Sequence, residues 1–175
     1  WLDDEGAIRT VSFERTLEGF VAEAQWVAAA GSVLLNERAE FAAVLLDEGV
    51  WTFTWQIDLT APGADAVRLG SPGSHGRTGG GYGGFAWRLP AGRDVDVRTP
   101  LASGEEAVHG TVAPWVAWSA SFAEGPATVV LAAADEVTAA DPWFVRVDSY
   151  PGIGSALAWD QEAVVLPGSP LRRRF

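Results

Sequence analysis

The residues best suited to binding a ligand lie in the segment DPWFVRVDSYPG, which runs from residue 141 to 152. It carries Asp141, Arg146 and Asp148 around two aromatic side chains. Because strand side chains alternate between faces, Arg146 and Asp148, two positions apart, would share one face. Charged side chains at the end of a strand beside aromatic rings could bond the hydroxyls of a sugar while the rings pack on its apolar faces.

A second candidate is the glycine-rich stretch GSPGSHGRTGGGYGGFAWRLP, residues 70–90. It lacks the lysine and the Ser/Thr ending of a P-loop, and it leads into a strand pattern rather than a helix. A phosphate site is therefore disfavoured. The stretch carries His75, Arg77 and Tyr82, and long loops of this kind are often functional. The equally weighted alternative is a hairpin connection whose glycines adopt positive φ.

The chain contains nine tryptophans, which is a high number for 175 residues. On a β-sandwich, exposed tryptophans can stack on sugar rings, and they also commonly fill the core. The candidates for a ligand-binding patch near the glycine-rich stretch are Trp87, its neighbour Arg88, Trp118 and Trp143. For any single tryptophan, a place in the core is the favoured interpretation.

Other reaction chemistries find little support. His75 and His109, each followed by glycine, could bind a metal or form an acid–base pair, but neither belongs to a motif with ligand spacing. The chain has no cysteine, which excludes thiolate chemistry, and no G-x-S-x-G motif of a serine hydrolase. We expect no metal and no cofactor.

The net charge and the terminal segments of the chain limit the kinds of partner and the cellular location that we expect. The net charge is −11 and the only basic cluster is at residues 172–174, so we expect no nucleic acid and no membrane as partner. No signal peptide, no cysteine and no apolar run of membrane-spanning length are present, which favours a cytoplasmic protein, although the location stays unknown. The first residue is Trp1, and we expect a fragment that lacks an N-terminal part.

The elements that must position these residues are strands. The clearest is WTFTWQIDLT, residues 51–60, in which apolar and polar side chains alternate strictly. Only the segment SVLLNERAEFAAVLL, residues 32–46, could be mistaken for a helix. Turn signals recur at roughly 8–12-residue spacing, as in all-β sandwiches and barrels. The sequence predicts one antiparallel β-sandwich domain over residues 1–175.

Three segments together resemble a known family. LLDEGVWTFTWQIDLTAP, GGGYGGFAWRLP and DPWFVRVDSYPGIGSALAWDQEAVVLPGSPLRRRF resemble a bacterial domain family of unknown function that is often labelled "PmoA family" or "methane oxygenase PmoA". The order of segments is also similar to the C-terminal half of galactose-mutarotase-like supersandwiches, which bind or epimerise sugars with a histidine acid and a carboxylate base. This second likeness is one of fold only.

The resemblance implies roles for two residues and three functional hypotheses. It places Asp148 near the carboxylate position, and His75 is the other residue that we expect to be catalytic. The H-x-H-H-R-G-like segment of an N-terminal half is absent, so that half of the same chain is an expected partner. The first hypothesis is a carbohydrate-binding or carbohydrate-processing domain. The second is a non-catalytic interaction half-domain with its tryptophans in the core, and a metal-dependent oxygenase is the least supported.

Overall fold

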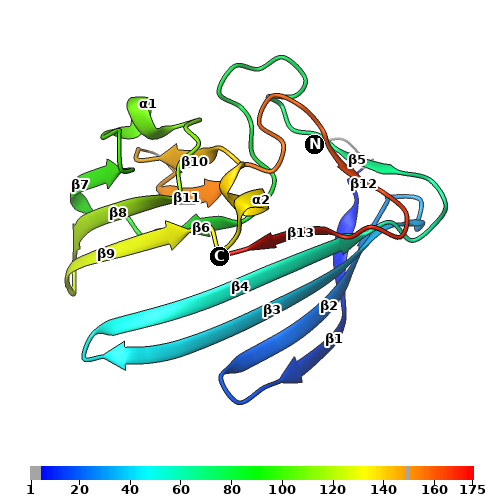
Figure 1. Cartoon of the computed structure of the whole chain (residues 1–175), viewed down its shortest axis with the longest axis horizontal. Helices are drawn as coiled ribbons and strands as arrows, with labels where there is room; N and C mark the ends of the chain where they lie inside the picture. The colour runs from blue at the N-terminus through cyan, green and yellow to red at the C-terminus, as the bar shows by residue number, and fades with distance from the viewer. Residues whose placement is uncertain (1–4, 149) are drawn as a thin grey trace. The chain divides into compact units, whose positions relative to one another are not determined.

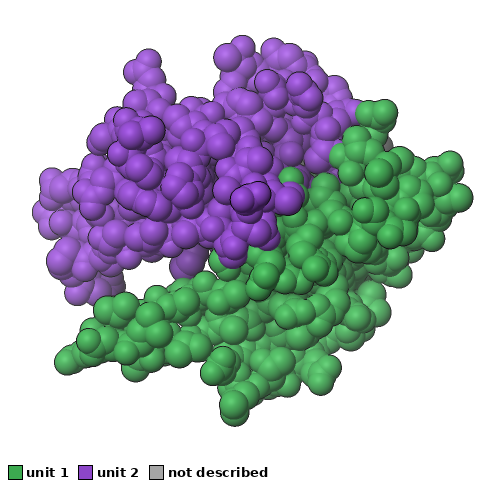
Figure 2. Space-filling model, viewed as in Figure 1, with its two compact units in different colours: residues 1–68, 164–175 green, residues 69–163 purple. Residues whose placement is uncertain are grey.

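The computed structural model describes residues 5–148 and 150–175, and its elements are mainly antiparallel strands (Figure 1). The all-β, antiparallel prediction is therefore confirmed. The chain divides into two compact units: unit 1 comprises residues 1–68 and 164–175, and unit 2 comprises residues 69–163 (Figure 2).

Unit 1 is built on a five-stranded sheet with the order β1-β2-β3-β4-β13. Its last strand comes from the C-terminal end of the chain and pairs antiparallel with β4, with Leu171 opposite Leu59 (Figure 1). The strands are β1 (Ala7–Arg15), β2 (Gly19–Val27), β3 (Val33–Asp47), β4 (Val50–Thr60) and β13 (Leu171–Arg174).

The alternation of apolar and polar residues in 51–60 gives this sheet one apolar and one polar face. In β4 the odd-numbered aromatic and aliphatic residues share one face, and the threonines, Gln56 and Asp58 share the other. On the apolar face one row of aromatic rings crosses the sheet, with successive centroids 4.8, 4.7, 5.9 and 5.7 Å apart. The rings belong to Phe13, Phe20, Phe41, Trp55 and Phe175. Each such pair contributes about 0.5–1.5 kcal/mol beyond its buried area.

Residues 32–46, whose pattern is also compatible with a helix, form most of strand β3. It pairs with β2 on one side and with β4 on the other, as in the pairs Phe20–Phe41 and Phe41–Trp55. Its buried residues Leu35 and Ala39 are four apart, a spacing that both a helix and a strand place on one face. The two flanking strands satisfy its backbone and so decide for the strand.

Unit 2 contains two three-stranded sheets with the orders β10-β11-β6 and β7-β8-β9, and two one-turn helices. Its core is formed by fully buried side chains that include Val116, Val145 and Ile153. A further two-stranded sheet is formed by β5 (Val67–Leu69) and β12 (Ala163–Val165). The other elements are β6 (Ala86–Arg88), β7 (Arg93–Arg98), α1 (Glu105–Val108), β8 (Trp115–Phe122), β9 (Gly125–Ala132), α2 (Glu136–Ala139), β10 (Trp143–Arg146) and β11 (Gly152–Ser155).

Candidate functional site

The glycine-rich stretch of unit 2 folds into a closed loop that packs on the segment around Trp159. The amide of Gly73 donates to the carbonyl of Gly80 across the loop at 3.1 Å. A Cβ atom would lie 2.0 Å from the carbonyl oxygen of Trp159 if placed on Gly73, and 2.2 Å from it if placed on Gly81. Glycine is needed at both positions because a rigid backbone occupies the space of a side chain. The glycines thus serve close packing.

The side chains of His109 and Arg146 meet at one backbone oxygen of this loop, the carbonyl of Gly79. The Nε2 atom of His109 lies 3.0 Å from it, and the Nη2 atom of Arg146 donates to it, also at 3.0 Å. The other ring nitrogen of His109, Nδ1, accepts the amide proton of Val145 at 3.2 Å. These two bonds require a neutral imidazole with its proton on Nε2.

The electrostatic surroundings favour the same neutral state of His109. Burial lowers the pKa of its imidazole, and the charge of Arg146 lowers it further, while the bond to Gly79 and the carboxylate of Glu105 act in the opposite direction. Since both ring nitrogens are engaged, His109 acts as a positioning group that holds the loop against β10.

Arg146 is held from several directions at the end of β10. Its Nη1 donates to the carbonyl of Val145 at 2.8 Å and lies 3.7 Å from a carboxylate oxygen of Glu105. Its guanidinium carbon lies 4.9 Å from the ring centroid of Phe144. Glu105 is fixed in turn, because its Oε2 accepts the amide proton of Val147 at 2.6 Å. The pair therefore has a defined geometry although about a third of each side chain is exposed.

A continuous run of rings lies beside this ion pair. Tyr82 contacts Phe144 edge-on at 6.0 Å between centroids, Phe144 contacts His109 at 5.2 Å, and His109 contacts Trp159 at 4.8 Å. Tyr82 is 46% exposed and forms the open end of the run. We call Tyr82, Phe144, His109 and Trp159 the aromatic run.

The sheet β10-β11-β6 places two arginines on one face. Arg146 pairs with Gly152, and Gly152 pairs with Arg88, so the two arginine side chains project from the same face with a glycine between them. The guanidinium of Arg88 lies 4.1 Å from the ring centroid of Tyr150. Trp87 is one residue away in β6 and opposite Ile153, so it faces the other side.

Three residues expected to bind ligand are buried. Trp118 and Trp143 are each 1% exposed and lie in the core of unit 2, so neither side chain presents a surface to a ligand in this structure. The indole N–H of Trp143 donates to the carbonyl of Ala113 at 2.9 Å. Asp141 is 8% exposed and accepts the hydroxyl proton of Ser155 at 3.2 Å. The two tryptophans lie in the core because burial of their large, mainly apolar rings is favourable.

The two residues predicted to be catalytic lie in separate surroundings. The Nδ1 of His75 is 2.8 Å from the carbonyl oxygen of Ser71, and its Nε2 is 4.0 Å from Glu162. Asp148 is exposed in the bend that follows β10. Among the contacts of the described residues, none joins His75 to Asp148, and their pairing stays a prediction. Arg77 is exposed in the glycine-rich stretch.

The site also includes residues that sequence reasoning missed. Glu105 begins the short helix α1, Trp159 lies far along the chain, and His109 belongs to no motif with ligand spacing. Only a glutamate directly after Gly104, as a helix-start signal, could have singled out Glu105.

Residues 5–148 and 150–175 contain neither a metal-binding cluster nor a membrane-spanning helix. Within these ranges, no group of three or more His, Cys, Asp or Glu side chains could hold a metal ion. No helix in the same ranges has the length and apolar character needed to cross a membrane.

A model described as "Family of unknown function (DUF6807)" matches residues 1–175. No curated protein and no solved structure matches the chain.

Proposed function

Starting from the fact that the chain belongs, over its whole length, to the family of unknown function DUF6807, we propose that unit 2 binds carbohydrate at the aromatic run. The single observation that carries this proposal is the contact of that run with a fixed arginine–glutamate pair.

The aromatic ring and the ion pair suit different parts of a sugar, namely its C–H face and its hydroxyl groups. The exposed ring of Tyr82 offers an apolar surface for the C–H face of a pyranose, with little conformational entropy to lose. Arg146 supplies planar donors and Glu105 supplies acceptors, and charge-assisted hydrogen bonds to hydroxyls are stronger than neutral ones. The half-exposure of the ion pair leaves its outer edges in reach of a ligand.

The proposal concerns binding, and catalysis is a separate question. His109 uses both ring nitrogens on backbone groups, so proton transfer would cost it one of these bonds. The likeness to mutarotase-like sandwiches supports the saccharide class by analogy of fold alone. His75 and Asp148 stay the candidates for an acid–base role.

A second function is favoured by a specific observation. Trp118 and Trp143 are core residues, and His109 and Arg146 are bonded to the backbone of the glycine loop. These features are also those of a non-catalytic domain that serves as an interaction surface. The two functions differ in whether a small saccharide is bound at all.

The experiment that tests the proposal is a saccharide titration of the full chain, followed by tryptophan fluorescence. Tyr82→Ala should weaken binding about three- to tenfold, as expected for an aromatic contact of about 0.5–1.5 kcal/mol. Trp51→Ala is the matched control, because Trp51 is an exposed aromatic residue of unit 1 at 56% exposure. Absence of any response over neutral and acidic mono- and oligosaccharides would favour the interaction domain instead.

A further inference from the structure

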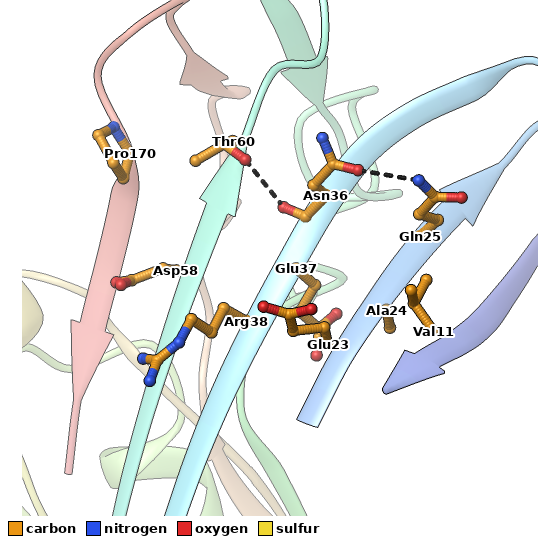
Figure 3. A pocket seen from close by; sticks show the side chains of 10 residues that line it. All are labelled: Val11, Glu23, Ala24, Gln25, Asn36, Glu37, Arg38, Asp58, Thr60 and Pro170. Carbon is orange, nitrogen blue, oxygen red and sulfur yellow. Dashed lines mark hydrogen bonds between the residues drawn. The ribbon is translucent and has the colours of Figure 1, made fainter. Parts of the chain in front are cut away.

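The polar face of the unit 1 sheet contains a hollow of about 400 Å³ (Figure 3). It belongs to the opposite face from the aromatic row, and its lining comes from β1, β2, β3, β4 and the residue before β13. A hollow of this size falls within the range of about 300–1,000 Å³ that is typical of small-molecule sites. We call it the polar hollow.

Strand register arranges the lining in two rows. Gln25 of β2, Asn36 of β3 and Thr60 of β4 are directly opposite one another and form the first row. The second row comes from the same three strands and contains Glu23, Arg38 and Asp58. Residues paired in this way have their Cβ atoms about 4.5–5.5 Å apart on one face. Donors and acceptors on neighbouring strands are thus closely spaced.

The first row is internally bonded in a way that leaves specific groups for a ligand. The Nε2 of Gln25 donates to the Oδ1 of Asn36 at 3.2 Å, and the hydroxyl of Thr60 donates to the backbone carbonyl of Asn36 at 3.4 Å (Figure 3). The hydrogen bonds made by described residues therefore engage the oxygens of Asn36. The Nδ2 protons of Asn36 remain as donors at one end of this bonded pair, and the Oε1 of Gln25 remains as an acceptor at the other end (Figure 3).

The charges of the second row are largely committed to neighbours. Asp58 accepts two bonds from Arg172, at 2.5 and 2.7 Å, and Arg38 forms an ion pair with Glu40. Glu23 accepts the hydroxyl proton of Ser12 at 3.0 Å. Glu37 alternates with Asn36 and Arg38, and its carboxylate accepts the indole proton of Trp26 at 2.6 Å on the other face. The carboxylates of Glu23 and Asp58 and the guanidinium of Arg38 remain on the polar face, and their net negative charge disfavours the entry of an anion.

The ligand must therefore offer paired donors and acceptors without negative charge. The lining contains no aromatic ring, so hydrogen bonds rather than stacking would hold the ligand. A hydroxyl group donates and accepts at once, so different hydroxyls of one saccharide can accept from the Asn36 amide at one end of the bonded pair and donate to the Gln25 amide at the other. We propose that the polar hollow binds an uncharged saccharide through the side-chain amides of Asn36 and Gln25. This site lies in unit 1 and is independent of the site proposed in unit 2.

The test is a titration of the ¹⁵N-labelled full chain with maltotetraose, cellotetraose, galactotetraose and tetragalacturonic acid, followed by nuclear magnetic resonance. The side-chain amide signals of Asn36 and Gln25 report on the polar hollow, and the indole N–H of Trp159 reports on the site in unit 2. Asn36→Ala should weaken binding of a neutral saccharide by at least about fivefold, because it removes two donors worth roughly 1 kcal/mol or more. Thr52→Ala is the control, an exposed residue of the same sheet face outside the lining.

Each outcome decides for or against the proposal. Shifts of the Asn36 and Gln25 amides with a neutral tetrasaccharide support it if the Gln25 shift is lost in Asn36→Ala and both shifts are kept in Thr52→Ala. If about 10 mM of every neutral saccharide leaves these amide signals unshifted, the proposal is overturned, because a dissociation constant above that concentration does not indicate a specific site. Stronger shifts with tetragalacturonic acid also overturn it. Shifts confined to Trp159 overturn the polar hollow while supporting the site in unit 2.

Discussion

Replacing Gly81 with alanine should loosen the glycine loop, because the position has no room for a methyl group. The added Cβ would lie 2.2 Å from the oxygen, 2.4 Å from the Cα and 2.6 Å from the carbonyl carbon of Trp159. Ordinary contact distances are about 3.5–4.0 Å, so the loop or the Trp159 segment must move by about 1 Å. Both are backbone, and neither can yield as a flexible side chain would.

The expected cost follows from that displacement. Overpacking of this kind typically costs about 1–3 kcal/mol, and a shift of the loop also strains the bonds of Gly79 to His109 and Arg146. No left-handed backbone conformation is involved at Gly81, so the loss is one of packing alone. We therefore expect Gly81→Ala to lower the free energy of unfolding by about 1–3 kcal/mol.

Urea unfolding of the full chain, followed by circular dichroism and tryptophan fluorescence, measures this loss. Gly63→Ala is the control, because nothing lies within 4 Å of its added Cβ and its φ is not in the left-handed region. The control should be neutral or stabilise by about 0.4–1 kcal/mol through the unfolded state. If Gly81→Ala were as stable as the wild type within about 0.5 kcal/mol, the packing of the loop on Trp159 would be refuted.

Two further predictions concern pH and the unit 1 sheet. Burial and the charge of Arg146 lower the pKa of His109 in the folded state, so the unfolded state binds more protons below about pH 6.5 and stability should fall there. His109→Asn should flatten the fall seen in urea unfolding between pH 7.5 and 5.5, and an unchanged profile would contradict this assignment. The hydrogen bonds from Arg172 lower the pKa of Asp58, so their stabilisation is present above about pH 4 and is lost as pH falls below it. Asp58→Asn should cost about 0.5–1.5 kcal/mol at pH 7, limited by the exposure of Arg172, and a difference of equal size at pH 3 would count against the ion pair.

The fold class could be predicted because strands carry their own periodicity. In residues 51–60 the alternation of aromatic and polar side chains is strict, and β4 has these two faces. The short helices α1 and α2 were not predicted, since one turn has no periodic signal. The division into two compact units was not anticipated, because β13 returns to the first sheet from the end of the chain.

The candidate site could be predicted only in part. Tyr82 and Arg146 were named from local patterns, and both contact the ring of Phe144. Glu105, His109 and Trp159 are brought to them by packing across unit 2, which a single sequence does not encode in any local spacing. The tryptophans 118 and 143 could not be distinguished from surface aromatics, because both kinds occur on alternating strands.

The measurement that tests the central claim most directly is a search for intermolecular nuclear Overhauser effects between a bound saccharide and the aromatic run. The account predicts effects from the axial protons of a pyranose to the ring protons of Tyr82 and Phe144, with a shift of the Arg146 side-chain signals in the same titration. A saccharide that binds without any effect at these two rings would contradict the account.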